Sequence, residues 1–533
     1  MERREFLKAL AASGAAAAVP SLFLTACGSG AAGSDGTLRI IQTASVASLD
    51  PIWTTAPGTR DLSFLVYDQL VAMDADFRPQ PQMAAGWTVE DAGRAYLFRL
   101  RDGLKFHDGS PVRPQDCIAS IRRWAARDGF GGVMLQHVAA MTPVDERSFR
   151  IALDRPFPLL PLAIGKSSAP SCLIMPERLA RTSPSEQVTE AIGSGPYRLL
   201  KEEWVPGSRT VLARFDDYVP RSEPTSGLAG SRKAGAPRLE LTQIGDGSTA
   251  MAALVAGEQD YWDMPPADLL AGLAADPNIM IGSRYVLPVN YMLQFNHRQP
   301  PFDRVEVRRA LAMGLDQREM LRTAVADPKL IRACYSFFAC DTPYGVEDGA
   351  EVLRTADVAQ AAAALAAAGY RNQKVVLLAS AEGIYASIAP VVEDRLRKIG
   401  FEVELVPLDF ASMAQRRTND GPVAEGGWSL FLTGWLGTDI LDPGVHPMLR
   451  GAGKAGYAGW CDDPRIEALR SAWMTAPTDA DRTRIARDLQ LQACRTLPYV
   501  PIGAMPSNAA YRKTVRNVFR APAAAYYNLG KTA

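Results

Sequence analysis

The sequence lacks several features that identify large classes of protein. Four histidines are spread over 533 residues, so a metal cage built from protein ligands alone is not expected. Basic and acidic side chains number 58 each, and a neutral chain has no basic surface for nucleic acid. Neither a Gly-x-Ser-x-Gly elbow nor a His-Glu-x-x-His motif occurs, which argues against the hydrolases that carry them.

Nucleotide binding is not predicted either. Gly165-Lys166-Ser167 and Gly530-Lys531-Thr532 imitate the end of a phosphate-binding loop. The glycine that such a loop requires five residues upstream is replaced by Leu160 and by Ala525. The sequence therefore indicates no cofactor and no resident metal.

The N-terminus reads as an export signal. Arg3-Arg4 opens a segment that looks like a twin-arginine motif, which implies translocation after folding, and an alanine-rich apolar stretch follows up to Ala26. Leu24-Thr25-Ala26-Cys27 looks like a lipobox, in which Cys27 is acylated and becomes the mature N-terminus. The alternative is an uncut membrane anchor, for which this stretch is barely long enough. We interpret residues 1–26 as a processing signal and 27–37, rich in glycine and serine, as a flexible tether.

Beyond the signal, the composition is that of a soluble globular protein, with 47% hydrophobic and 22% charged residues. No second apolar run is long enough to span a bilayer. Of the seven cysteines, Cys334 and Cys340 enclose five residues, so we expect a short disulfide loop. Cys461 and Cys494 are either a second pair or two buried free thiols.

The hydrophobic pattern alternates between strands and helices. A strand is expected from Leu38 onward. Residues 95–125 predict a strand, an Asp-Gly turn, a second short strand and a helix with Asp116 near its start. Residues 374–408 predict strand, helix and strand, a unit that favours a parallel sheet. The fold class is therefore α/β, with more than one lobe.

Several blocks occur in an order that resembles the family 5 extracellular solute-binding proteins, which deliver peptides, nickel chelates and related solutes to ABC importers. The blocks are "ASLDP" (47–51), "YLFRLRDGLKFHDGSPVRPQD" (96–116), "GSGPYRL" (193–199), "PPFDRVEVRRALAMGLDQREM" (300–320), "GWLGTDILDP" (434–443), "GWCDDPRIEALRSAW" (459–473) and "LPYVPIG" (497–503).

This resemblance implies a two-lobed clamshell of the type II periplasmic-binding-protein class, with the larger lobe subdivided and the ligand enclosed between lobes. We place lobe I at 38–289, lobe II at 290–499 and a return to lobe I at 500–533, with hinge crossovers near 287–290 and 498–502. Closure about such a hinge allows binding energy to select one conformation.

In peptide-binding members, a carboxylate in the Gly-Trp-x-x-Asp block pairs with the ligand's α-ammonium. Here Gly434 and Trp435 open that block, and Asp439 follows with one residue more than the usual spacing. The resemblance makes Asp439 the first candidate and Asp442 the second, although Asp442-Pro443 is also a turn sequence and Asp439 a possible cap. Trp435 is a candidate pocket wall or a core residue.

Other candidates come from their place at strand ends, where ligands enter α/β crevices. Glu382 and Tyr385 follow the strand that begins at residue 374. Ser45 and Ser48 flank the end of the first strand. Asn290 and Tyr291 lie at the predicted hinge and are candidates to line the cleft, with strand pairing as the alternative explanation.

Two histidines need separate interpretations. His107 lies in a block that reads as a hairpin, which favours a structural role. His446, seven residues beyond Asp439, is the histidine best placed to meet a metal chelate.

The function that the resemblance implies is that of a monomeric, lipid-anchored, extracytoplasmic receptor. It would capture short peptides and pass them to an ABC permease, without enzymatic activity. The alternatives are a receptor for a nickel chelate or another small solute and, in a different class, a periplasmic hydrolase.

Overall fold

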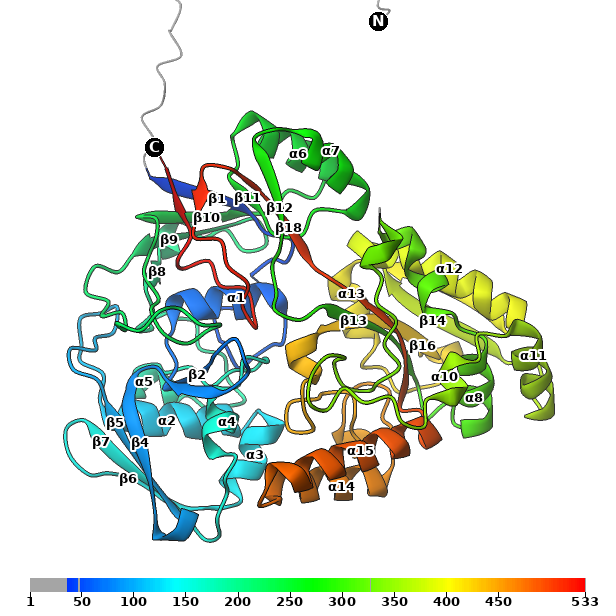
Figure 1. The fold of residues 1–533 in the computed structure, drawn as a ribbon, viewed down its shortest axis with the longest axis horizontal. Coiled ribbons are helices and arrows are strands. Elements are labelled where there is room, and N and C mark those ends of the chain that lie inside the picture. The colour runs from blue at the N-terminus through cyan, green and yellow to red at the C-terminus, as the bar shows by residue number, and fades with distance from the viewer. Residues whose placement is uncertain (1–35, 47, 326, 533) are drawn as a thin grey trace, which may run out of the picture. The chain divides into compact units, whose positions relative to one another are not determined.

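Three larger sheets form the framework of the computed structural model (Figure 1). The structure describes residues 36–46, 48–325 and 327–532, so the predicted signal, Cys27 and most of the tether lie outside the described residues. The seven-stranded sheet contains, in spatial order, β12 (Ile279–Ser283), β18 (Asn508–Arg512), β11 (Tyr261–Trp262), β1 (Thr37–Ile41), β10 (Arg238–Thr242), β9 (Arg209–Arg214) and β8 (Tyr197–Leu199).

The five-stranded sheet has the order β15 (Glu402–Leu408), β14 (Lys374–Ser380), β16 (Leu430–Leu436), β13 (Val289–Phe295) and β17 (Tyr499–Met505). Strand β14 is buried along its whole length except at Lys374, as a continuous apolar run in a sheet covered on both faces should be. It pairs in parallel with β15, and helix α12 (Gly383–Ile399) connects the two. The strand–helix–strand unit predicted from the sequence is confirmed.

Helices cover both faces of this sheet. Val375 and Leu377 of β14 share a core cluster with Leu396 of α12. The alternate residue Leu378 belongs to a separate cluster with Met413 of α13 (Phe410–Arg416). This alternation follows from the two-residue period of a strand, and it places α13 and α12 on opposite faces.

The third sheet is antiparallel, with β4 (Ala84–Glu90), β5 (Ala95–Leu100), β7 (Ser148–Leu153) and β6 (Val138–Pro143) in that order. Helix α2 (Pro114–Ala125) packs on it through Cys117, Ile121 and Trp124. The prediction of a short strand between β5 and α2 is wrong. Its residues make only one isolated bridge, between Lys105 and Pro111, because β5 already has β4 and β7 as partners on both sides.

The chain crosses between the two large sheets twice. It leaves the seven-stranded sheet after Ser283 and enters the five-stranded sheet at Val289. It returns between Met505 and Asn508, several residues after the return expected from the sequence. Figure 1 shows the red strand β18 lying beside the green strands β11 and β12. The lobe boundaries themselves stay a prediction.

Helix α1 (Pro57–Val66) is buried at every residue after Pro57. Its first turn lies so close to the loop after β1 that a Cβ at Gly58 would be 2.2 Å from the Ser45 carbonyl oxygen. Only glycine permits this approach. The helix therefore carries two adjacent charged residues, Arg60 and Asp61, into the interior.

The remaining elements complete the coverage of the sheets. Two short hairpins are β2 (Val71–Met73) with β3 (Pro79–Pro81) and β19 (Val515–Arg516) with β20 (Gly530–Lys531). The other α-helices are α3 (Gly129–Leu135), α4 (Leu160–Gly165), α5 (Glu177–Ala180), α6 (Gly247–Ala256), α7 (Leu270–Ala275), α8 (Val305–Met313), α9 (Gln317–Leu321), α10 (Glu351–Arg354), α11 (Val358–Ala367), α14 (Pro464–Thr475) and α15 (Asp479–Thr496).

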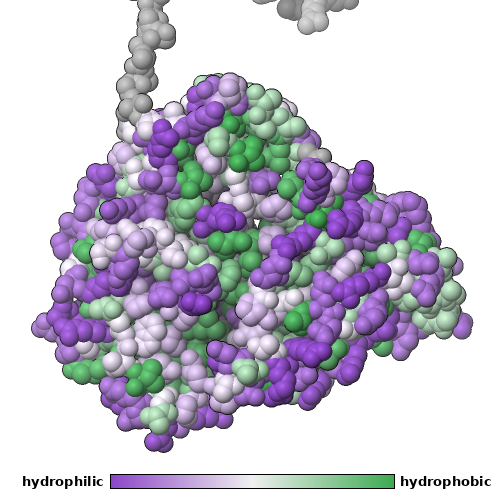
Figure 2. Space-filling model, viewed as in Figure 1, coloured by the Kyte–Doolittle hydropathy of each residue, from purple (hydrophilic) through white to green (hydrophobic). Residues whose placement is uncertain are grey.

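The surface is mostly polar on the face seen in Figure 2, and hydrophobic residues gather in a recessed strip near its middle. Among the described residues, none of the helices has the length and apolar character needed to cross a membrane.

Candidate functional site: a buried ion network beside strand β16

Asp439 lies in a short 3-10 turn (Gly437–Ile440) that directly follows β16. Its Oδ2 atom is 3.3 Å from Nη1 of Arg60 on α1. The Thr438 hydroxyl in the same turn donates to the Pro522 carbonyl oxygen at 2.8 Å. The turn thus joins the end of the five-stranded sheet to α1 and to the C-terminal segment.

The ion pair continues through α1 toward the seven-stranded sheet. Nε of Arg60 is 3.5 Å from Oδ1 of Asp61, and Oδ2 of Asp61 is 2.7 Å from Nη2 of Arg284. Nη1 of Arg284 is 3.3 Å from Oδ2 of Asp263, and its Nη2 donates to the Tyr526 hydroxyl at 2.5 Å. These five ionic groups, Asp439, Arg60, Asp61, Arg284 and Asp263, are called the ion network below.

The ion network contains three carboxylates and two guanidinium groups, so it carries one excess negative charge when all five are ionised. All five residues are at least nine-tenths buried. Oδ1 of Asp439 has no hydrogen-bond partner among the described residues. Burial raises the pKa of the Asp439 carboxyl, and the nearby cations Arg60 and Lys166 oppose that rise. This oxygen of Asp439 is therefore a buried acceptor, and a donor group brought to it would offset the cost of its burial.

Asp442 has a different role. Its Oδ1 accepts hydrogen bonds from the backbone N–H groups of Gly444, at 2.8 Å, and Val445, at 3.1 Å. Burial raises the pKa of this carboxyl to about 6, although these two hydrogen bonds act in the opposite direction. The contacts are those of a turn, which was the structural interpretation of Asp442-Pro443.

Gly434 and Trp435 lie at the end of β16, and Tyr385 lies in the first turn of α12. A Cβ at Gly434 would be 3.0 Å from the Tyr385 hydroxyl, so the absence of a side chain at this position leaves room for the Tyr385 ring. The Tyr385 ring also packs edge-to-face on Tyr291, with centroids 6.0 Å apart. Trp435 packs edge-to-face on Tyr457 at 5.6 Å. The structure thus brings Gly434, Tyr385 and Tyr291 into contact beside Trp435, and their role in binding stays a prediction.

The other candidates are less closely grouped. Glu382 is exposed, and Ser45 is half-buried. Ser48 is buried, and its hydroxyl accepts the Asp50 backbone N–H at 3.1 Å. The side-chain amide of Asn290 donates to the Pro288 carbonyl oxygen at 3.2 Å. Ser48 and Asn290 are therefore engaged in local backbone contacts.

Both histidines singled out from the sequence are held by backbone groups. Nε2 of His107 lies 3.0 Å from the Gly195 carbonyl oxygen, and burial lowers the pKa of the ring to about 4. His446 is 1% exposed, and its Nδ1 accepts backbone N–H groups of Met448 and Leu449 while Nε2 contacts the Phe337 carbonyl oxygen. The expectation that His446 could meet a metal chelate is therefore wrong, since neither ring nitrogen is open.

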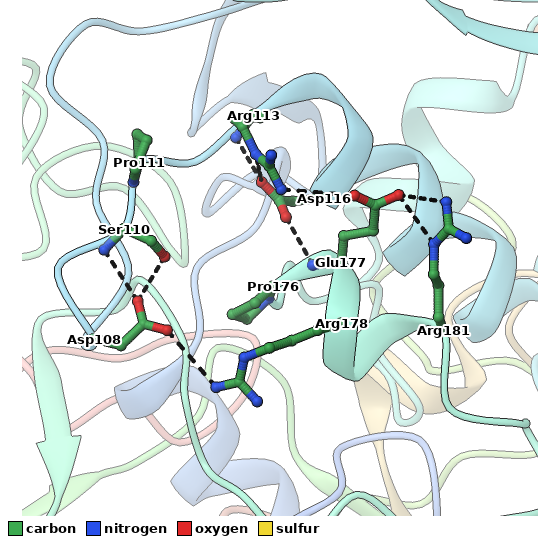
Figure 3. Close-up of a pocket in the computed structure, with 9 residues that line it drawn as sticks. All are labelled: Asp108, Ser110, Pro111, Arg113, Asp116, Pro176, Glu177, Arg178 and Arg181. Atoms are coloured by element: carbon green, nitrogen blue, oxygen red, sulfur yellow. Dashed lines mark hydrogen bonds and ion pairs between the residues drawn. The ribbon is translucent and has the colours of Figure 1, made fainter.

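A separate hollow of about 490 Å³ opens beside α2 and α5. Figure 3 shows Arg113, Arg178 and Arg181 facing the carboxylates of Asp108, Asp116 and Glu177. The pairs include Arg178 with Asp108 at 3.7 Å and Arg181 with Glu177 at 2.7 Å. The residues that line the hollow include none of the candidate binding residues predicted from the sequence.

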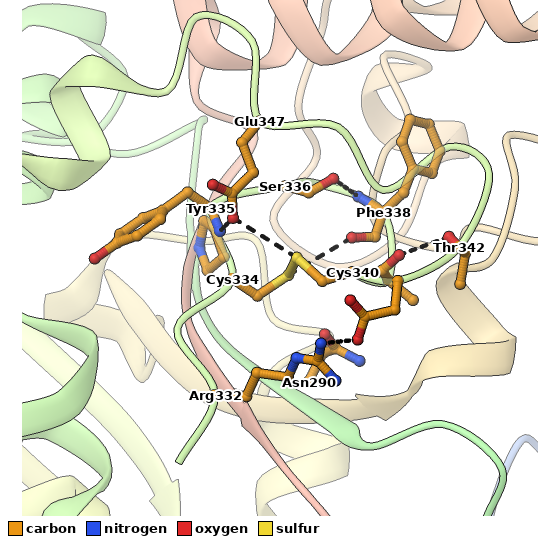
Figure 4. The surroundings of a disulfide bond; sticks show 12 residues. Asn290, Arg332, Cys334, Tyr335, Ser336, Phe338, Cys340, Thr342 and Glu347 are labelled. Carbon is orange, nitrogen blue, oxygen red and sulfur yellow. Dashed lines mark hydrogen bonds and ion pairs between the residues drawn. A yellow bond between two sulfur atoms is a disulfide. The ribbon is translucent and has the colours of Figure 1, made fainter. Parts of the chain in front are cut away.

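Cys334 and Cys340, the pair singled out from the sequence, are joined by a disulfide (Figure 4). The loop is anchored at Arg332, whose backbone pairs with Ala504 of β17, and Ala504 also lies opposite Asn290 in β13. Cys461 and Cys494 are buried and free, and so are Cys117 and Cys172. Of the two interpretations of Cys461 and Cys494, that of free thiols holds.

Sequence reasoning missed the cations around Asp439. Arg60 and Arg284 had no role assigned, and Lys166 was considered only as a false phosphate-loop lysine. One signal existed for Arg60. It stands next to Asp61 inside the otherwise largely apolar segment "PGTRDLSFLV", and adjacent charges in a buried helix require partners.

Comparison with known proteins decides the family. The model described as "Bacterial extracellular solute-binding proteins, family 5 Middle" matches residues 78–456, well over half of the chain. The chain belongs to this family. A model of the twin-arginine translocation signal matches residues 1–20, which confirms the interpretation of Arg3 and Arg4. Together these matches support an extracytoplasmic location.

Individual relatives match this chain over 93–100% of its length. A probable peptide ABC transporter periplasmic-binding protein of Sinorhizobium fredii is 34% identical over 100% of this chain and 99% of its own. The dipeptide-binding protein of a Pseudoalteromonas species, solved with Met-Leu, superposes with a TM-score of 0.79 at 19% identity, covering 93% of this chain and 100% of its own. An agropinic-acid-binding protein of Agrobacterium tumefaciens gives 0.78 at 23% identity, with coverages of 93% and 99%. The fold is thus the two-lobed type II arrangement of family 5.

Proposed function

We propose that this family 5 protein is the lipid-anchored, peptide-binding subunit of an ABC importer. It captures short peptides with a free N-terminus, holds the α-ammonium at Asp439, and passes the peptide to a membrane permease. In this role it catalyses no reaction.

The observation that carries the proposal is the unfilled Oδ1 acceptor of Asp439 in a network with one excess negative charge. A peptide ammonium that enters a closed site loses its water, and an anionic partner offsets that cost. Arg60 already neutralises part of the Asp439 charge, so the site suits a single cationic group. The likeness to the Sinorhizobium fredii peptide-binding protein supports the same ligand class.

The first test is native mass spectrometry of the mature protein as purified, followed by calorimetry with peptides of two to five residues. Asp439→Asn keeps the shape and removes the charge. We expect it to weaken binding of free peptides by about 2–5 kcal/mol, or tens- to thousands-fold. N-acetylated peptides should bind the wild type poorly and discriminate little between the two forms.

Asp442→Asn is the matched control, because it removes a buried carboxylate three residues away whose acceptor oxygen serves a turn. It should bind free peptides as the wild type does. Unchanged binding by Asp439→Asn would overturn the assignment. A co-purified nickel complex or a single non-peptide solute would overturn the peptide class.

Lipid anchoring rests on Leu24-Thr25-Ala26-Cys27. Metabolic labelling with a fatty acid should modify the wild type and fail with Cys27→Ser, and Arg3→Lys with Arg4→Lys should retain the precursor in the cytoplasm. Labelled Cys27→Ser would rule the lipid site out.

A further inference from the structure

The loop closed by the Cys334–Cys340 disulfide contacts the turn that carries Asp439. Inside this loop, the backbone N–H of Ala339 donates to the carbonyl oxygen of Ile440 at 3.3 Å. Ile440 follows Asp439 and is the last residue of the same 3-10 turn. Ala339 and Ile440 are also buried in one hydrophobic cluster. The disulfide loop therefore supports the Asp439 turn through a direct contact.

The two ends of this loop are held in different ways. Gln317 fixes Cys334, because its side-chain carbonyl accepts the Cys334 N–H at 2.7 Å and its side-chain N–H donates to the Cys334 carbonyl oxygen at 2.8 Å. At the other end, the Ala339 carbonyl oxygen accepts the hydroxyl of Thr342, which belongs to the same stretch of chain. The disulfide thus ties the Cys340 end, beside Ala339, to an end that is already fixed.

An ion pair between Arg332 and Asp341 also joins the two ends of the loop. Their side chains are 50% and 53% exposed, and exposed pairs contribute little because water screens them. The covalent bond is therefore the main constraint on the Cys340 end. Cys334 is buried, whereas Cys340 is half-buried. A thiol in solution would therefore attack the bridge at the sulfur of Cys340.

The export route places the two cysteines in two redox environments in succession. The twin-arginine signal at residues 1–20 implies that the chain folds before it leaves the cytoplasm, where thiols are kept reduced. Cys334 and Cys340 therefore enter the fold as thiols. The bridge between them is made in the oxidising compartment outside. The contact behind the Asp439 turn thus differs covalently before and after export.

We propose that this disulfide is a redox switch for ligand binding: the bridged form holds the Asp439 turn in its binding position, and the dithiol form releases it. This inference rests on the proposed function, since the switch acts through Asp439. The bridge forms by exchange with the disulfide of another molecule. Cys334 and Cys340 give up two protons and two electrons as their S–S bond forms, and the other disulfide is reduced to two thiols. The protein therefore binds peptides weakly in the cytoplasm and tightly after export.

Calorimetry on the mature protein tests the switch, with a free peptide that binds the oxidised wild type. The protein is measured as purified and after reduction, and alkylation with mass spectrometry verifies the state of the bridge. We expect reduction to weaken binding about 3- to 10-fold, the effect of one lost hydrogen bond. Cys334→Ser with Cys340→Ser should bind as the reduced form does and ignore the reductant. Cys461→Ser, which removes a buried free thiol, is the matched control and should keep the full response.

Two further readouts separate this role from a general effect on stability. Reduction should speed hydrogen exchange at the Ala339 amide, measured by NMR, because that N–H loses its fixed acceptor. In Asp439→Asn, reduction should change the peptide affinity by less than about twofold, because two changes that act through one group are not additive. NMR titration measures the weaker affinities of this variant.

The proposal is overturned if the oxidised and reduced wild type, both folded by circular dichroism, bind the peptide equally. It is also overturned if exchange at the Ala339 amide is unchanged, or if reduction weakens binding by Asp439→Asn as much as by the wild type. In these cases Asp439-dependent peptide binding can still hold, so the proposed function survives. If the oxidised wild type binds no peptide, or binds it without need of Asp439, both proposals fail.

Discussion

The ion network and the hollow beside α5 contain the same chemical groups in opposite environments. In the hollow, the side chains of Arg178 and Arg181 are 50% and 74% exposed. In the network, those of Arg60 and Asp61 are 6% and 1% exposed. Exposed pairs are screened by water and contribute little, whereas buried charges depend on every partner. The network is therefore the region where a missing partner has an energetic cost.

The largest effect should come from removing a shared cation of the network. Arg284→Met leaves Asp61 and Asp263 without the guanidinium that lies 2.7 and 3.3 Å from them. We expect a loss of about 3–5 kcal/mol in the free energy of unfolding, measured by urea denaturation. A loss below about 1 kcal/mol would show that the network behaves like the hollow.

A second test uses pH. Burial raises the pKa of Asp442 to about 6, whereas an unfolded aspartate titrates near 3.9. The folded protein therefore holds the Asp442 proton more tightly than the unfolded chain does. The protonated carboxyl stabilises the fold below about pH 4, and this stabilisation is lost as the pH rises to about 6. Over this pH range the loss in the free energy of unfolding is about 3 kcal/mol.

Asp442→Asn should remove this part of the pH dependence, because an asparagine keeps a carbonyl acceptor for the N–H groups of Gly444 and Val445. Urea denaturation of variant and wild type between pH 4 and 7 gives the difference curve. Parallel curves would contradict the shifted pKa.

A third test compares a covalent constraint with the ionic ones. Replacing Cys334 and Cys340 together by serine opens a loop whose ends are six residues apart. So short a loop stabilises by about 2 kcal/mol, and the variant should stay folded. Alkylation of the oxidised wild type should leave both cysteines unlabelled until reductant is added. Rapid labelling without reductant would rule the bridge out, and Cys461→Ser serves as the control for a buried free thiol.

The smallest effect is expected in the hollow. Arg178→Met removes contacts to Asp108 and Glu190, and it should change the free energy of unfolding by less than about 1 kcal/mol. It is also the exposed counterpart of Arg284→Met. A loss as large as that of Arg284→Met would remove the distinction between the two regions.

Local patterns predicted much of the framework. The apolar run of β14 and its parallel pairing with β15 across α12 both depend on near neighbours in the chain. The family blocks made Asp439 a candidate binding residue, and in the structure this residue is buried. Signals between residues that are close in the chain can be read from one sequence alone.

The partners of Asp439 were beyond reach of such patterns. Arg60 stands 379 positions earlier in the chain, and nothing local to either residue encodes the contact. The failed strand near Lys105 shows the converse, since its local pattern was overridden by the partners that β5 had already gained.

The position of β18 also sets the order of events during synthesis. Strands β11 and β12 stand apart until residues 508–512 fill the place between them. A ribosome must therefore release nearly the whole chain before the seven-stranded sheet can close. Export through the twin-arginine route takes cargo that has already folded, so β18, the last strand of the seven-stranded sheet to be made, has to be in place before export. A chain that stops short of it offers the exporter an open sheet edge, a form that invites aggregation instead of passage.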